Sequence, residues 1–355
     1  MTPPAAVVAS VPVPAGAGLA AHRAARRRRG VAVVGGLAAL ALALFVATMM
    51  LGSYRLGAWD VVAATLGIGG DPSVEFVVRE LRLPTAVTGL AAGLALGVAG
   101  VVFQRLLANP LASPDFVGVS SGASVAAVAA ITLYGASSAG ISVAALAGAF
   151  LTCLLVYLLA WRDGVSGYRF VLIGIGIAEF MYAICGVLIA RAEMFDARAA
   201  TAWLVGSVGY AGQGQLRALL AACAALLPLA LVLARPLRAL ELGDDAASAL
   251  GVGVERCRLA LIGVAIALVA FATAAVGPIL FVALMAGPIA ARVLGPARGL
   301  LAAAGLVGAV IVLSADLVAV HALPVVLPTG VVTGAIGAPY LIWLLATANR
   351  AGRGG

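Results

Sequence analysis

The stretch Leu106–Ser124 reads LLANPLASPDFVGVSSGAS and separates two long apolar runs of the chain. Pro110 and Pro114 interrupt helices, because proline lacks a backbone N–H and disfavours a helical conformation in the residue before it. Asn109 and Ser113 carry side chains that hydrogen-bond the free backbone groups at helix ends. The stretch therefore predicts the end of one helix and the start of the next.

Two glycines follow the second proline, and both are small enough for a neighbouring helix to approach closely. Gly118 and Gly122 lie four residues apart, so they share one face of a helix. We interpret the whole stretch as a tight cytoplasmic hairpin that holds two helices together. A substrate-binding loop is the alternative interpretation.

The composition indicates that most of the chain lies in lipid. Hydrophobic residues make up 64% of the 355 residues and charged residues 10%, against about 45–50% and about 25% in soluble domains. A transmembrane helix needs about 20 apolar residues. On that rule the sequence predicts an all-α membrane protein with ten spans: about 31–51, 85–107, 116–134, 141–161, 169–190, 213–234, 259–276, 279–295, 299–319 and 329–348. The transmembrane domain covers 31–348.

The positive charges predict the orientation of these spans. All 22 basic residues are arginine, and the run Arg26–Arg29 stands directly before the first apolar segment. Such a run can bind nucleic acid, but beside an apolar segment it indicates a cytoplasmic flank. We expect a disordered basic tail over 1–30, a second short tail over 349–355, and both termini in the cytoplasm.

Several function classes are excluded by missing residues. A chain without lysine has no Walker-type phosphate loop, so any ATP must bind to another chain. The two histidines and four cysteines have no metal-ligand spacing, so we expect no metal site and no cofactor. An intramembrane enzyme would need a catalytic set that the sequence does not contain. A secondary transporter would need several intramembrane carboxylates, and only Glu179 is central in a span.

Two loops are longer than a turn requires. The first, 52–84, is predicted to be external. The second, 235–258, is predicted to be cytoplasmic and contains GDDAASALG at 243–251. Asp244 and Asp245 suit a helix N-terminus, and Gly251 suits a C-terminal cap. The sequence thus predicts a short helix outside the bilayer, which could also be a simple connector.

The stretch from Leu81 to Ser124, LRLPTAVTGLAAGLALGVAGVVFQRLLANPLASPDFVGVSSGAS, resembles the FecCD-type permeases. These are membrane subunits of ABC importers for iron–siderophore complexes and are related to the cobalamin importer. Further matches follow in order: VLIGIGIA (171–178), WLVGSV (203–208), ELGDDAASALGVGVER (241–256), GPILFVAL (277–284), SADLVA (314–319) and LPTGVVTGAIGAPYLIWLL (327–345). The sequence departs from the family pattern at Thr329, where the family usually has valine.

The resemblance implies a permease fold of the cobalamin-importer type in a bacterial inner membrane. It also implies several partners: a second permease subunit, identical or paralogous, two ATPase subunits and an extracytoplasmic siderophore-binding protein. The substrate would be a ferric siderophore, with a catecholate of the enterobactin type favoured. Cobalamin, haem or another metal chelate is the alternative. The spans offer no row of carboxylates or soft ligands for bare iron, which favours passage of a whole chelate. No nucleic acid is expected.

The resemblance also suggests roles for individual residues. The coupling segment that would contact the ATPase comprises Leu242, Gly243, Asp244, Asp245, Ala246, Ala249, Leu250 and Gly251, with Ala247 expected in the same apolar knob. Arg79, Arg82 and Arg198 would dock the binding protein, although arginines at a membrane interface also snorkel without any partner. Glu179 would line the translocation pathway or pair with a buried polar group. Asp316 matches a family motif, and we expect it to cap a helix.

Overall fold

The computed structural model describes residues 16–52, 55–68, 71–161, 167–295, 299–322 and 324–351. The described elements are helical, which confirms the all-α fold class. They are α1 (Gly16–Met50), α2 (Ala58–Leu66), α3 (Pro72–Phe76), the π-helix η1 (Val77–Arg82), α4 (Leu83–Leu106), the 3₁₀-helix η2 (Pro114–Val117), α5 (Val119–Tyr134), α6 (Ser138–Ala160), α7 (Gly167–Arg191), α8 (Met194–Val205), the 3₁₀-helix η3 (Val208–Tyr210), α9 (Gln213–Leu240), α10 (Asp244–Ala249), α11 (Val254–Val276), α12 (Val282–Leu294), α13 (Leu300–His321) and α14 (Thr329–Ala351).

Each of the ten predicted spans corresponds to one helix: α1, α4, α5, α6, α7, α9, α11, α12, α13 and α14. Within the described residues, eight of these are long and apolar enough to cross a membrane. The other two, α5 and α12, contain 16 and 13 residues. A helix rises about 1.5 Å per residue, so neither covers a hydrocarbon core of about 30 Å by itself. Each is preceded by a non-α-helical stretch that adds to its length.

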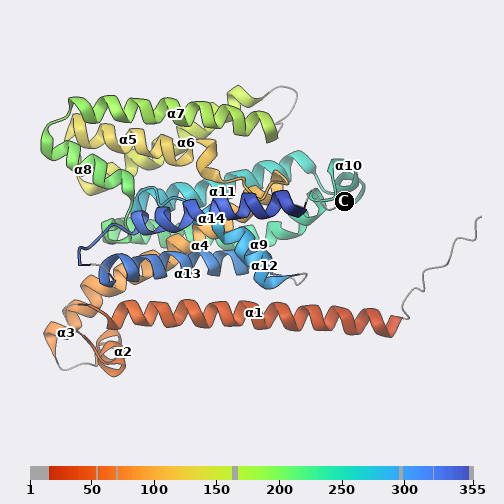
Figure 1. Ribbon diagram of the computed structural model, residues 1–355, viewed down its shortest axis with the longest axis horizontal. Helices are drawn as coiled ribbons and strands as arrows, with labels where there is room; N and C mark the ends of the chain where they lie inside the picture. Colours follow the sequence, from red (N-terminus) through yellow and green to blue (C-terminus); the bar gives the residue numbers. More distant parts are fainter. Residues whose placement is uncertain are drawn as a thin grey trace, which may run out of the picture.

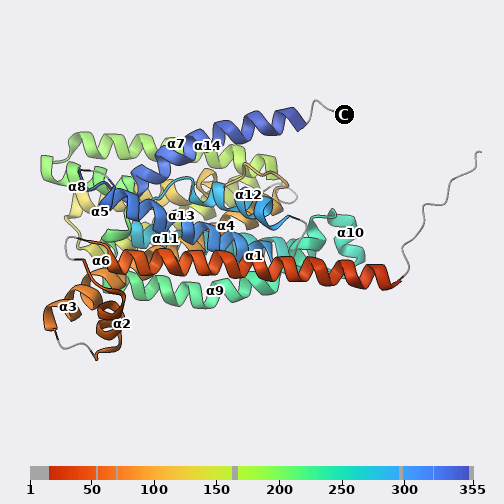
Figure 2. The same ribbon diagram turned by 60° about the horizontal axis from the view of Figure 1, so that its bottom comes forward.

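The long helices run roughly side by side, with α4 in the middle and α1 on the outside of the bundle (Figures 1 and 2). The start of α1, the short helix α10 and the end of α14 lie at one end of the molecule, on the right in Figure 1. Helices α2, α3 and α8 lie at the opposite end. The arrangement therefore places both ends of the described chain at the same end of the molecule as the predicted coupling helix.

Helix α4 forms the centre of the core because it is apolar all round and rich in glycine. Of the 18-residue apolar stretch that marks this span, 83% is buried inside the protein. A Cβ atom added to Gly97 would overlap the carbonyl oxygen of Ala304 in α13, and one added to Gly100 would overlap that of Ala283 in α12. The small residues of α4 thus let two other helices touch its backbone.

A proline inside α12 is accommodated by a side chain from α4. Pro288 has no N–H to donate to the carbonyl of Leu284, four residues earlier. The side-chain amide of Gln104 donates to that carbonyl instead, at 3.0 Å. Gly287 leaves the space that Gln104 fills, because a Cβ there would overlap the Gln104 Oε1 atom. A neighbouring helix thus satisfies the backbone that the proline leaves unpaired, as expected for a broken helix in lipid.

The N-terminal tail differs from its prediction. Helix α1 begins at Gly16, whereas a disordered tail was predicted for 1–30. Alanine and arginine are strong helix formers, so the basic segment continues the first span outward by several turns. Residues 1–15 lie outside the described part of the chain. At the other terminus α14 runs to Ala351, three residues into the predicted tail over 349–355.

The loop over 52–84 is largely helical, which the sequence analysis did not predict. Pro72 begins α3, and the carboxylate of Asp71 accepts the Ser73 N–H at 2.8 Å as an N-cap. η1 then joins α3 to α4 without a break. A further unpredicted helix, α8, lies between α7 and α9.

Candidate functional site

The short helix α10 projects from the end of the bundle, between α9 and α11 (Figure 1). Gly243 before it and Gly251 after it have φ angles of 98° and 80°, in the left-handed region that glycine adopts without strain. Leu242 and Leu250 are 67% and 65% exposed. Two leucines therefore flank a small helix and present an apolar surface.

The predicted apolar knob is wrong in one residue. Ala247 is fully buried against the body of the protein, because it lies on the inner face of α10. Ala249 is exposed and Ala246 is half-buried. The exposed apolar residues at α10 are therefore Leu242, Ala249 and Leu250.

Two ion pairs connect the α10 region to the long helices. Asp244 accepts from Arg258 of α11 at 2.7 Å, and Glu241 accepts from Arg105 at the end of α4 at 3.4 Å. Asp245 is exposed and makes no hydrogen bond or ion pair with the described residues. The sequence analysis singled out Asp244 but missed both arginine partners, because nothing in the spacing of the sequence links the two sides of each pair.

The hairpin between α4 and α5 has the predicted form. The Asn109 side chain accepts the Leu111 N–H at 2.9 Å. Pro114 begins η2, and Ser113 caps it by accepting the Asp115 N–H at 3.4 Å. Pro110 lies in the turn just after α4 ends. The prolines and the capping side chains thus separate the two helices as expected.

The glycines after this turn also act as predicted, as close-approach positions. A Cβ at Gly118 would lie 3.1 Å from the Thr152 Cγ2 atom, and one at Gly122 would overlap the Thr152 side chain and the Gly148 carbonyl oxygen. Both neighbours belong to α6. The hairpin therefore fixes α5 against α6.

A carboxylate that was not predicted lies inside the hairpin. Asp115 accepts hydrogen bonds from Ser120 at 2.6 Å and from Ser113 at 3.0 Å. Burial raises the pKa of the Asp115 carboxyl, and the two serine hydrogen bonds act in the opposite direction. These contacts hold η2 against the first turn of α5.

The three predicted docking arginines lie at the opposite end of the molecule from α10. Arg82 donates to the Met49 and Met50 carbonyl oxygens at 2.8 and 3.2 Å, so it satisfies the C-terminal end of α1. Arg79 pairs with Glu75 at 2.7 Å and reaches the Thr65 carbonyl at 3.3 Å. Arg79 and Arg82 therefore both make contacts that hold this end of the protein together.

The remaining two predicted positions are exposed. Arg198 lies on the surface of α8. Glu179 lies near the middle of α7 and is also exposed, and it makes no ion pair or hydrogen bond with the described residues. Pairing of Glu179 with a buried group of the same chain is therefore not observed. Only 17% of the apolar 18-residue stretch of α7 is buried inside the protein. Most of this helix is therefore not covered by other helices of the chain.

A polar cluster joins three segments at the end that holds α8. The Thr329 hydroxyl donates to Asp316 at 2.8 Å and accepts the Val208 N–H at 3.3 Å. Asp316 lies inside α13, so the prediction that it caps a helix is wrong for α13. It holds instead the first residue of α14. The threonine at 329 thus has a specific partner that valine could not bind.

Backbone contacts reinforce the same junction. The Gly330 N–H donates to the Gly206 carbonyl at 3.0 Å, and the Ser207 N–H donates to the Val276 carbonyl at 2.7 Å. Gly206 and Gly277 have φ angles of 76° and 73°, which other residues rarely adopt. The ends of α8 and α11 and the start of α14 are therefore locked together.

No group of three or more His, Cys, Asp or Glu side chains in the described ranges is placed to hold a metal ion. Cys153, Cys185 and Cys223 are buried and unbridged. The arrangement instead consists of a projecting helix at one end, a rigid junction at the other, and packed helices between them.

Comparisons with known proteins agree with this arrangement. The model of the FecCD transport family matches residues 40–347. The ferric enterobactin transport system permease protein FepG of Escherichia coli (strain K12) is 42% identical over 300 residues, covering 84% of this chain and 91% of that protein. The achromobactin transport system permease protein CbrC of Dickeya dadantii (strain 3937) is 37% identical over 310 residues, covering 86% and 88%.

One solved structure is similar to this chain over most of the length of both. An inward-facing conformation of a metal-chelate type ABC transporter superposes with a TM-score of 0.79 at 28% identity, covering 89% of this chain and 99% of the other. The fold, the family model and the relatives thus agree along the same residues. The chain belongs to the FecCD transport family.

Proposed function

We propose that this chain is the permease subunit of an ABC importer that moves ferric–siderophore complexes into the cytoplasm of a bacterium. The main support for this proposal is the projecting helix α10. Leu242 and Leu250 beside it are exposed, and Asp244 forms an ion pair with Arg258 of α11. The relatives named above transport ferric enterobactin and achromobactin, which supports a siderophore substrate. A catecholate siderophore is the favoured substrate, and cobalamin or another metal chelate is the alternative.

The orientation of the chain follows from its arginines. Both termini and α10 belong to the cytoplasmic side, where the run Arg26–Arg29 stands before the apolar part of α1. The opposite end, with α2, α3 and α8, faces the extracytoplasmic binding protein. The protein is then a multi-pass protein of the inner membrane.

The ATP-driven movement enters the permease through α10. Leu242 and Leu250 insert into a groove of a separate ATPase subunit, and the exposed Asp245 meets basic residues beside that groove. The pair Asp244–Arg258 passes the displacement to α11, and Arg105–Glu241 passes it to α4. Because α4 packs its backbone against α12 and α13, a shift of its end reaches the centre of the bundle.

The substrate path lies beside α7, between two permease subunits that are identical or paralogous. The uncovered face of α7 carries Glu179, a costly residue in lipid unless it meets water or a partner. Extracytoplasmic docking uses Arg198 and the exposed part of Arg79, which attract acidic residues of the binding protein over long range.

The coupling assignment is tested with Leu242→Asp combined with Leu250→Asp. We expect these changes to reduce co-purification of the ATPase subunit at least about tenfold, because a buried apolar contact is replaced by unpaired charges. Leu66→Asp with Ile68→Asp is the matched control, since both residues are 65% exposed at the opposite end of the molecule. Equal co-purification of the two double variants with the ATPase would reject the assignment.

The transport assignment is tested in proteoliposomes that contain the permease, its ATPase and its binding protein. We expect uptake of a ferric catecholate siderophore with ATP and none with a proton or sodium gradient alone. Uptake driven by the gradient without ATP would indicate a secondary transporter. Uptake of cobalamin in preference to the siderophore would change the substrate class and leave the importer class intact.

The docking assignment is tested by Arg79→Glu combined with Arg198→Glu. We expect weaker binding-protein association, with a loss that shrinks as salt rises, because exposed charges are screened. Arg191→Glu, an exposed arginine at the end of α7, serves as the control. Unchanged affinity of the double variant would remove both residues from the docking site.

A further inference from the structure

A large basic cavity lies at the α10 end of the molecule, between the start of α1, the end of α9 and the start of α13. It has a volume of about 1420 Å³, above the usual size of a site for a small molecule, about 300–1,000 Å³. Six arginines line it: Arg23, Arg26, Arg27, Arg28, Arg105 and Arg238. Among the described residues, Glu241 is the one acidic side chain that lines the cavity, and it pairs with Arg105.

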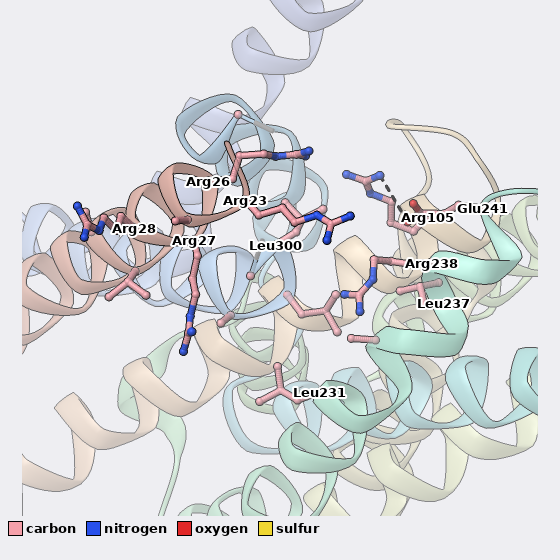
Figure 3. Close-up of a pocket in the computed structure, with 18 residues that line it drawn as sticks. Arg23, Arg26, Arg27, Arg28, Arg105, Leu231, Leu237, Arg238, Glu241 and Leu300 are labelled. Atoms are coloured by element: carbon pink, nitrogen blue, oxygen red, sulfur yellow. Dashed lines mark hydrogen bonds and ion pairs between the residues drawn. The ribbon is translucent and has the colours of Figure 1, made fainter. Parts of the chain in front are cut away.

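The arginines come from three different helices and several converge on one space. In Figure 3 the side chains of Arg23, Arg105 and Arg238 point toward one another, whereas Arg27 and Arg28 point away from that group. Guanidinium groups stay charged at all ordinary pH values. Several positive charges gathered around one cavity attract anions, so this lining favours an anionic ligand.

The remaining lining of the cavity is apolar. Val31, Leu231, Leu237, Leu300 and Leu301 also line it. Figure 3 shows Leu300 near Arg23, Leu237 beside Arg238 and Leu231 below them. A cavity with a cationic part next to an apolar part matches a molecule with an anionic head and a hydrocarbon chain. A small soluble anion would leave the leucines without a partner.

The position of the cavity in the fold also favours a lipid as its ligand. Helix α1 changes from the arginine run to an apolar sequence at Val31, which is the level where a span leaves the hydrocarbon core. Only 11% of the apolar 18-residue stretch of α1 is buried inside the protein. The helix therefore lies at the edge of the bundle, where lipids have access. The cavity thus lies at the depth of the phospholipid headgroups, on the leaflet that the proposed orientation makes cytoplasmic.

We propose that this cavity is a binding site for an anionic phospholipid of the cytoplasmic leaflet. Arg23, Arg105 and Arg238 hold the phosphate, since the planar guanidinium group binds phosphate oxygens in pairs. The acyl chains lie along the leucines between α1, α9 and α13. The bound lipid thereby fills the gap between the outlying helix α1 and the rest of the bundle, beside Glu241 and the coupling region.

The test uses native mass spectrometry of the full-length chain, purified in a nonionic detergent, with phosphatidylglycerol or phosphatidylcholine added. We expect phosphatidylglycerol to bind at least about tenfold more tightly than phosphatidylcholine. Arg23→Gln combined with Arg238→Gln should lower that affinity by about 25-fold, which corresponds to about fivefold for each arginine removed. Equal binding of the two lipids to the unmodified chain would overturn the proposal.

The matched control is Arg235→Gln combined with Arg256→Gln. Arg235 lies one turn from Arg238 on α9, Arg256 lies at the start of α11, and neither lines the cavity. We expect a change below about twofold in phosphatidylglycerol affinity for this control. An equal loss in the two double variants would mean general attraction by surface charge and would overturn the site. If the first double variant does not fold, Arg238→Gln alone should show the fivefold loss.

Two competitors separate the lipid from other occupants. Millimolar inorganic phosphate should not displace phosphatidylglycerol; complete displacement would identify a site for small anions and overturn the lipid assignment. The ATPase subunit should bind without releasing the lipid. Release of the lipid on ATPase binding would show that the cavity is an ATPase contact and would also overturn the proposal. The lipid and phosphate measurements need neither transport nor the ATPase, so their outcome is independent of the proposed function, whereas the ATPase competition rests on it.

Discussion

Asp244 at the start of α10 receives the Arg258 guanidinium of α11 on both carboxylate oxygens, at 2.7 and 3.1 Å. The side chains are 58% and 23% exposed, and ion pairs with such access to water contribute only about 0.2–1 kcal/mol to stability. The contact therefore sets the orientation of α10 relative to α11 more than it stabilises the fold. Its effect should appear in coupling and not in unfolding.

Exchanging the two charges tests this contact. Asp244→Arg and Arg258→Asp should each lower the ratio of substrate transported to ATP hydrolysed several-fold, because two like charges then repel each other. The double exchange should restore most of the ratio, while thermal unfolding in detergent changes little throughout. Asp245 has no partner among the described residues, so Arg258→Asp should not restore the ratio when it is combined with Asp245→Arg. An exchange that fails to restore coupling would mean that Asp244 acts on another chain.

Replacing Gln104 with leucine should destabilise the protein by about 1–3 kcal/mol, since the Leu284 carbonyl is left buried without a donor. Equilibrium unfolding in mixed detergent and denaturant measures this loss of stability. In a Pro288→Ala background the loss should be smaller, because alanine restores the N–H that can bond Leu284. An equal loss in the two backgrounds would show that Gln104 stabilises the bundle through packing alone.

Thr329→Val should lower the free energy of unfolding by about 1–3 kcal/mol, because Asp316 and the Val208 N–H both lose a partner in a buried cluster. Thr333→Val is the matched control: the side chain is equally buried, but its hydroxyl bonds only the Gly330 carbonyl of its own helix. We expect the control to lose less than half as much. The two variants would have similar stability if the hydroxyl–carboxylate contact contributed nothing.

Substituting alanine for glycine should have opposite signs at two helix positions. Gly97→Ala forces α4 away from the Ala304 carbonyl, and overpacking of this kind costs about 1–3 kcal/mol. A Cβ at Gly263 in α11 would meet nothing within 4 Å, so Gly263→Ala should stabilise by about 0.5–1 kcal/mol through higher helix propensity. Thermal midpoints in detergent report both. A stabilising Gly97→Ala would contradict the close packing of α4 on α13.

The sequence was sufficient to predict the long helices, because a run of about 20 apolar residues has few structures available in lipid. It also predicted the hairpin at Asn109–Gly122, where proline and capping side chains act locally. The short helices α2, α3 and α8 were missed, since each is too short for a strong periodic signal. The prediction for 1–30 relied on the richness of that tail in proline, alanine and arginine, and it neglected the helix propensity of alanine and arginine.

Contacts between distant segments explain the remaining errors in the candidate site. Ala247 was placed in the exposed knob with the other apolar residues of its segment. Which face of a short helix turns inward, however, depends on how α9 and α11 position it. Pro288 signals an unpaired carbonyl four residues earlier, yet no local pattern identifies Gln104 as its donor. Arg82 likewise resembles any interfacial arginine until α1 is seen to end beside it.

The central position of α13 has a consequence for biosynthesis. Its partners α4 and α1 are made early, and translation proceeds at about 5–20 residues per second. The glycine face of α4 must therefore wait for about ten seconds or longer in the membrane before α13 exists. The close contact between α4 and α13 therefore forms only after eight earlier spans have been made, late in the assembly of the bundle.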